Sequence, residues 1–190
     1  LAPIEAGEKD GFSLNRVNVR GRIDTKNKRI DLDQGDFSRS DTRPAYNVGV
    51  AVTGSLDYST PDPRLAFGVA GTRMPMSVMK RLWPVMTAHH VREWVEQHVG
   101  QGTVERVVIA GNAPLADFKT DGPPTPDDGL SIDVETSGTS LRPIPGLPPI
   151  DDADLTVRVT GRTATIRLGR GVVNVAPGRS LPINASGFPC

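Results

Sequence analysis

Apolar and polar residues alternate along most of this chain. In the stretches LSIDVETSG and DLTVRVTG, Leu, Ile or Val stands at every second position, with hydroxyl or charged residues between them. A period of two is typical of an antiparallel strand that has one dry face and one wet face. We therefore predict a mainly β fold whose strands present a shared apolar face.

Three longer stretches share one plan and indicate a weak internal repeat. VNVRGRIDTKNKRIDLDQGDF, VAVTGSLDYSTPDPRLAFGVAG and VRVTGRTATIRLGRG each contain an alternating strand, a glycine near its end, a polar turn and a second alternating strand. Because the turns are local, these units are expected to be hairpins in series, which form an antiparallel meander. The proline-containing segments Lys119–Gly129 and Arg142–Asp152 are expected to be loops between hairpins.

A helical insert at about residues 76–99 interrupts the period of two. Apolar residues at helical spacing predict two short helices, because Pro84 separates them and Gly100 ends the second. Such an insert is expected to pack on the sheet or to cover one end of it. The predicted packing positions are Leu82, Trp83, Val91, Trp94, Val95 and His98.

All three histidines of the chain lie in this insert, which raises the question of a metal or catalytic site. His89 and His98 are nine positions apart, so they lie on opposite sides of a continuous helix. His89 and Glu93 are close enough to meet, but two ligands do not make a zinc site, and HHxxE is not the HExxH arrangement. A metal-dependent hydrolase that uses His89, His90 and Glu93 remains a third alternative, and we expect no metal, no cofactor and no catalytic residue.

Charge and composition argue against several classes of function. The 190 residues include 22 basic and 22 acidic residues, and this balance argues against nucleic-acid binding. No apolar run approaches the ~18 residues of a membrane span. The single cysteine, Cys190, cannot form an internal disulfide, and no P-loop, GxSxG or GxGxxG motif is present. We expect residues 1–190 to be a single segment of a longer protein.

The extended apolar face has two interpretations. Aromatic residues, which usually anchor a closed core, make up only 5% of the chain. A sheet that curls without closing would leave an apolar trough, which implies a ligand, a membrane or a partner. A closed β-sandwich core is the other interpretation. The candidate trough residues are Val48, Val50, Val52, Leu65, Phe67, Val69, Ile132, Val134, Leu155, Val157, Val159, Ile166 and Leu168. The stretch TVERVVIAG (Thr103–Gly111) also predicts a strand, but its pattern does not show which side is buried.

Several stretches resemble the AsmA-like superfamily of bacterial envelope proteins. They run from GSLDYSTPDPRLAFGVAGTRMPMSVMKRLWP through VREWVEQHVGQGTVERVVIAGNAPLADF to GLSIDVETSGTSLRPIPGLPPIDDADLTVRVTGRTATIRLGRG. The similarity is to the YhdP-type branch and its domain of unknown function, and it covers roughly residues 15–180. The insert with LWP and REW and the segment GLPPIDDADLTVRVTGRTATI are its most specific parts.

The resemblance implies a periplasmic protein that is held to the inner membrane by an N-terminal anchor outside these residues. It implies an extended curled sheet with an apolar groove that binds phospholipid acyl chains. It also implies a role in phospholipid transport between the membranes or in outer-membrane integrity, with an envelope protein as a further candidate partner. The alternative is a non-enzymatic structural or protein-interaction β module, in which the helix pair binds a partner.

Overall fold

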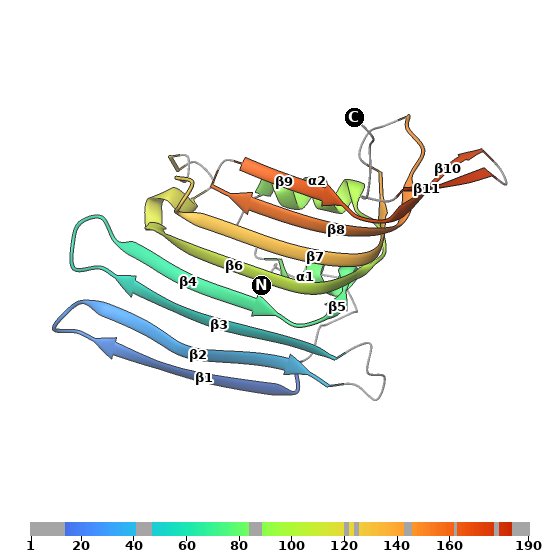
Figure 1. The fold of residues 1–190 in the computed structure, drawn as a ribbon. Coiled ribbons are helices and arrows are strands. Elements are labelled where there is room, and N and C mark those ends of the chain that lie inside the picture. Colours follow the sequence, from blue (N-terminus) through green and yellow to red (C-terminus); the bar gives the residue numbers. More distant parts are fainter. Residues whose placement is uncertain are drawn as a thin grey trace, which may run out of the picture.

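In the computed structural model, the chain forms one open antiparallel sheet with two short helices (Figure 1). The structure describes residues 14–40, 47–83, 89–119, 122–123, 126–142, 146–161, 163–176 and 179–183. Consecutive strands are neighbours along most of the sheet, and its two ends do not meet. The predicted antiparallel meander with a two-helix insert is confirmed, and the described strands form a single sheet rather than a closed sandwich.

The sheet has eleven strands. In chain order they are β1 (Arg16–Asp24), β2 (Arg29–Arg39), β3 (Val48–Asp57), β4 (Arg64–Gly71), β5 (Met74–Pro75), β6 (Thr103–Pro114), β7 (Leu130–Leu141), β8 (Ile150–Thr160), β9 (Thr163–Leu168), β10 (Gly171–Ala176) and β11 (Arg179–Ile183). Their spatial order is β1-β2-β3-β4-β6-β7-β8-β10-β11, with β5 on β6 and β9 on β8. The predicted hairpins β1–β2, β3–β4 and β8–β9 are all present.

Cross-strand register places the alternating apolar residues of the strands on one face, because antiparallel partners point to the same side. One row across the sheet consists of Val50, Gly71, Val107, Val134, Val157 and Ile166. The adjacent row consists of Val52, Val69, Ile109, Ile132, Val159 and Ala164. All the candidate trough residues therefore share this face, which we call the apolar face.

Charged residues occupy the opposite face. The pairs Arg106–Glu135 and Arg158–Asp133 lie directly across from each other on neighbouring strands, with 3.7 Å between nitrogen and oxygen in each pair. Exposed pairs of this kind contribute only about 0–1 kcal/mol each. They keep this face of the sheet hydrated, and most of the stability of the fold must come from the apolar face.

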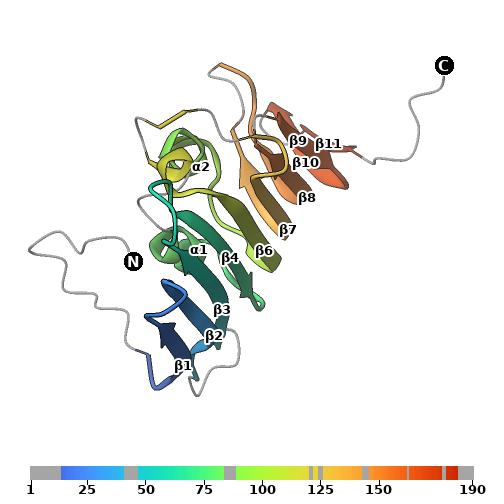
Figure 2. The ribbon, with the colours of Figure 1, turned by 90° about the vertical axis from the view of Figure 1, so that its left-hand side faces the viewer.

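The helices α1 (Met76–Leu82) and α2 (His89–His98) both lie over the apolar face, as Figure 2 shows. The core sits between these helices and the central strands. Its buried residues are Val48, Met74, Met76, Met79, Val99, Val104, Leu130, Ile132, Val134, Leu141, Ala153, Leu155 and Val159. Outside this cover, at β1, the apolar face meets solvent, and Val17 and Ile23 are 57% and 71% exposed.

The expected loop Arg142–Asp152 is wrong at its end, because β8 already begins at Ile150. Ile150 pairs with Leu141 on β7 and with Val173 on β10. The β7–β8 register shifts twice beyond Thr136, and Asp152 has a φ of 50°. These irregularities place acidic residues inside a strand, and they explain why the sequence IDDAD does not show the alternation of a regular strand.

Candidate functional site

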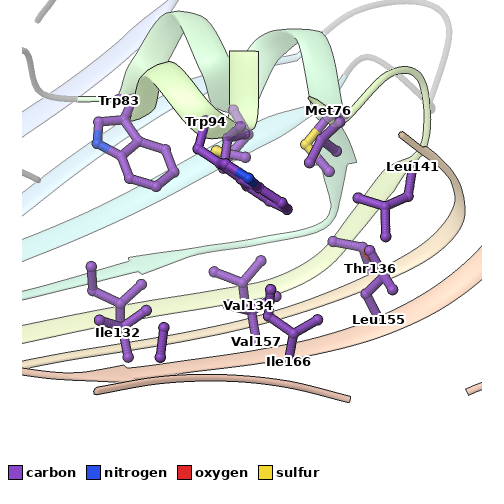
Figure 3. Close-up of a pocket in the computed structure, with 15 residues that line it drawn as sticks. Met76, Trp83, Trp94, Ile132, Val134, Thr136, Leu141, Leu155, Val157 and Ile166 are labelled. Carbon is purple, nitrogen blue, oxygen red and sulfur yellow. The ribbon is translucent and has the colours of Figure 1, made fainter. Parts of the chain in front are cut away.

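An apolar cleft of about 350 Å³ separates the helix pair from the sheet (Figure 3). The helix-side wall consists of Met76, Met79, Trp83, Trp94, Val95 and Val99. The sheet-side wall consists of Ile132, Val134, Thr136, Leu141, Leu155, Val157, Val159, Ala164 and Ile166. Figure 3 shows Trp83 and Trp94 reaching down from the helices toward the β7–β9 side chains across an open space.

The local folding of both walls follows from their sequence patterns. The sheet-side wall, which we call the floor, consists of every second residue of β7, β8 and β9. The register of these strands places Val134, Val157 and Ile166 in one line. The helix-side wall, which we call the roof, consists of residues at helical spacing, such as Met76 and Met79 on α1, both of which are buried. Two amphipathic elements therefore face each other without filling the space between them.

None of the described side chains that line the cleft carries a charge. Its one hydroxyl residue, Thr136, accepts a hydrogen bond at 2.9 Å from the Oγ1 of the fully buried Thr139. Empty apolar cavities exclude water and admit apolar ligands. A volume of 350 Å³ lies at the lower end of the roughly 300–1,000 Å³ that is typical of small-molecule sites. The cleft is chemically suited to a hydrocarbon.

Both tryptophans of the chain line this cleft. The indole of Trp94 stacks on the imidazole of His98, with 5.0 Å between ring centroids and 11° between ring planes. The Nδ1 of His98 also lies 2.9 Å from the carbonyl oxygen of Trp94. His98 therefore supports Trp94 at the cleft wall, as the predicted helical stripe requires.

The hydrolase alternative depends on residues that the structure describes only in part. The side chains of His89, His90 and Val91 lie outside the described residues. Within the described ranges, no three His, Cys, Asp or Glu side chains gather closely enough to hold a metal ion. The described residues that line the cleft include no ionisable group, and Thr136 carries their one hydroxyl.

A second, smaller cleft of about 90 Å³ lies beside α1, over β3, β4, β6 and β7. It is lined by Val50, Phe67, Val69, Met74, Met79, Leu82, Trp83, Val107, Ile109, Ile132 and Val134. Four of these residues also line the larger cleft: Met79, Trp83, Ile132 and Val134. The two spaces are therefore neighbours along the same apolar face.

Backbone hydrogen bonds fasten the insert to the sheet at one end, which we call the clasp (residues 74–76, 98–102 and 140–142). Met76 N–H donates to the Gly102 carbonyl at 2.9 Å. Gly100 N–H donates to the Ser140 carbonyl at 2.7 Å, and a β-bridge joins Val99 to Leu141. Both helices thus extend from one anchored edge, with the Trp83 end of α1 farther along the cleft.

Lys80 links the two helices near the clasp. Its Nζ donates to the Val99 carbonyl, just beyond the end of α2, where a cation also complements the helix dipole. Burial lowers the pKa of Lys80, and the nearby Glu96 carboxylate opposes that shift. The ammonium lies outside the described lining of the cleft.

The structure brings together most of the candidate trough residues, but not all of them. Val50, Phe67, Val69, Ile132, Val134, Leu155, Val157, Val159 and Ile166 line one cleft or both. Val48 is a core residue, and Val52, Leu65 and Leu168 share the apolar face outside the two clefts. Of the insert positions, Leu82, Trp83, Trp94 and Val95 line a cleft, and His98 supports Trp94.

Sequence reasoning missed Val107 and Ile109, which belong to the ambiguous strand β6. A register shift between Val104 and Arg106 changes the alternation, so buried Val104 and cleft-lining Val107 are three positions apart. Glu105 stands at this bulge, where Ser137 Oγ and Arg73 Nε donate to its carboxylate and hold its pKa below the usual range. The adjacent charged residues Glu105 and Arg106 in VERVV interrupt the alternation, and this interruption is the signal that could have identified the bulge.

Comparison with family models, with curated proteins and with solved structures finds no match to this chain. In the part of the chain that the structure describes, neither helix has the length and apolar character needed to cross a membrane.

Proposed function

We propose that this chain is a non-enzymatic lipid-binding segment of a periplasmic AsmA-like protein, and that its clefts hold phospholipid acyl chains. The observation that carries the proposal is the 350 Å³ cleft with uncharged, apolar walls between the helix pair and the sheet. The resemblance of the sequence to AsmA-like envelope proteins supports the choice of ligand. Phospholipid transport between the inner and outer membranes is the role that fits such a ligand.

The energetics of the cleft favour a hydrocarbon chain without a headgroup site. Burial of one CH2 contributes about 0.8 kcal/mol, so a chain needs no polar contact to bind. Ile166 lines the cleft and is 47% exposed, so the cleft opens to solvent beside β9. A headgroup can remain in water at this opening while the acyl chain lies between the indoles and the β7–β9 floor.

The uncovered part of the apolar face supports transport rather than permanent storage. Val17 pairs with Phe37, and Phe37 pairs with Val50, so the face continues from the smaller cleft to β1. Exposed apolar surface of this kind marks binding sites in soluble proteins. The alternative, an interaction module, requires a filled interior, and the two clefts do not favour it.

Quenching of tryptophan emission tests the proposal directly. Because both tryptophans line the cleft, a phospholipid with a nitroxide on its acyl chain is expected to quench most of the emission in a saturable way. A water-soluble nitroxide without an acyl chain is the control, and it is expected to quench weakly and without saturation. Emission that the lipid leaves unchanged, in protein shown to be folded by circular dichroism, would contradict acyl-chain binding and favour the interaction module.

Native mass spectrometry of protein purified from bacterial cells identifies the natural ligand. We expect added masses that match phospholipids, and lipid analysis after solvent extraction then gives their headgroups. A uniform ligand-free mass that remains after incubation with phospholipid vesicles would count against the proposal.

A further inference from the structure

Two side chains on the helix side stand between the larger cleft and the smaller one. Met79 and Trp83 project from α1 and the residue after it, and both line both clefts. Beneath them, Ile132 and Val134 of β7 form a floor that the two clefts also share. Met79 and Trp83 therefore form a partition on the helix side, whereas the floor on the sheet side is continuous.

The floor under the partition has no step that would stop a ligand. Val107 pairs with Val134, and Val134 pairs with Val157, so aliphatic side chains continue from the smaller cleft into the larger one. The neighbouring row repeats this arrangement with Ile109, Ile132 and Val159. An alkyl chain that lies across the strands meets the same chemistry on both sides of the partition.

Met79 is the adjustable part of this partition. A methionine side chain is unbranched and adopts many conformations, whereas an indole moves as one rigid body. Met79 is buried, at 7% exposure, and it faces the cleft rather than solvent. A shorter side chain at this position opens the partition without changing the floor.

We propose that Met79 is the specificity-determining residue that limits how far a linear alkyl chain can reach along the apolar face. This inference rests on the proposed function. It identifies the bound group more closely, as one extended alkyl chain of a lipid that fills the larger cleft and stops at Met79. Truncation of Met79 joins the smaller cleft to the larger one and admits a longer chain.

The volumes give the expected chain lengths. At roughly 30 Å³ for each methylene-sized group, the volume of one water molecule in the liquid, 350 Å³ holds on the order of ten carbons. The smaller cleft of 90 Å³ adds about three more on the same scale. Each added CH2 that becomes buried is expected to lower Kd about fourfold.

The test is a chain-length series of saturated fatty acids from octanoate to palmitate. Each acid displaces a nitroxide-labelled fatty acid, and recovery of tryptophan emission gives its Kd. In the unmodified protein, Kd is expected to fall with each CH2 and then level off once the larger cleft is full. In Met79→Ala the fall is expected to continue for about three more carbons, which strengthens binding of the longest acids by several tens-fold.

Met76→Ala is the matched control, because Met76 is also buried, at 3% exposure, but lines only the larger of the two clefts. It removes the same side-chain volume from the larger cleft without opening it to the smaller one, so any increase in the chain length at which Kd levels off is expected to be smaller than in Met79→Ala. If Met79→Ala does not fold, Met79→Val removes less volume and is expected to shift the same limit in the same direction.

The outcomes separate this inference from the proposed function. Binding that levels off at the same chain length in all variants would overturn the role of Met79 and leave acyl-chain binding intact. An equal shift in Met76→Ala would also overturn it, because general loosening of the roof would then explain the result. Failure of every acid to displace the probe, or of the probe to quench the unmodified protein, would overturn both proposals.

Discussion

Ile166→Asp is expected to weaken alkyl-chain binding about tenfold to a hundredfold and to leave the sheet folded. Ile166 lines the larger cleft and is 47% exposed, so a carboxylate at this position keeps its water in the free protein. A bound chain would remove part of that water, and burial of an unpaired polar group against hydrocarbon costs about 1–3 kcal/mol, which is a lower bound for a carboxylate. That cost corresponds to roughly one to two powers of ten in Kd.

Ile23→Asp is the control for this substitution. Ile23 lies on the same face of the sheet, is 71% exposed and stands outside both clefts. Titration with the nitroxide-labelled fatty acid is expected to give an unchanged Kd for Ile23→Asp and a raised Kd for Ile166→Asp. Equal Kd values in the two variants would remove Ile166 from the ligand site.

Gly102→Ala is expected to lower the free energy of unfolding by about 3 kcal/mol. Gly102 has a φ of 152°, which side chains rarely adopt, and its carbonyl accepts the clasp hydrogen bond from Met76. A Cβ at this position would lie 2.6 Å from Thr139 Oγ1 and 2.9 Å from Thr139 Cα. Backbone strain costs about 1–3 kcal/mol, and overpacking against the backbone adds a comparable amount when it cannot relax.

Gly146→Ala separates these two costs. Gly146 also has a positive φ, at 87°, but an added Cβ meets nothing within 4 Å. Urea unfolding is expected to show a loss of about 1 kcal/mol for Gly146→Ala, which reports backbone strain alone. If both variants lose the same stability, the close approach of Gly102 to Thr139 is not a tight contact, and the clasp tolerates a side chain.

The hairpins could be predicted from sequence because one face of the sheet is buried or apolar along almost its whole width. Where Val157 and Ile132 must face inward, a slip of one residue would turn them outward, so the alternation is strict. The same argument failed at Val104 and at Asp152, where a bulge lets the buried side change without a regular pattern. The alternation of apolar and polar residues therefore shows which face a residue lies on only within a stretch of strand that contains no bulge.

The position of the insert could not be predicted in the same way. Helical spacing identified Trp94 and Val95 as packing residues, but it carries no information about which strands they approach. Their placement over β7–β9 depends on the clasp, whose bonds from Gly100 and Met76 are made by backbone groups. Backbone bonds of this kind leave little trace in residue type, apart from the glycines that allow the close approach.

The pairing of β4 and β5 with β6 makes the whole helical insert the loop of a single hairpin. Gly71 pairs with Val107, and Met74 pairs with Val104, so the stem is complete before the first helix begins. The entropy of closing a loop grows only slowly with its length, so residues 76–102 add little to the cost of forming that hairpin. The pairing of β4 and β5 with β6 therefore does not depend on how long the insert is, whereas the core and the clasp depend on which residues the insert contains.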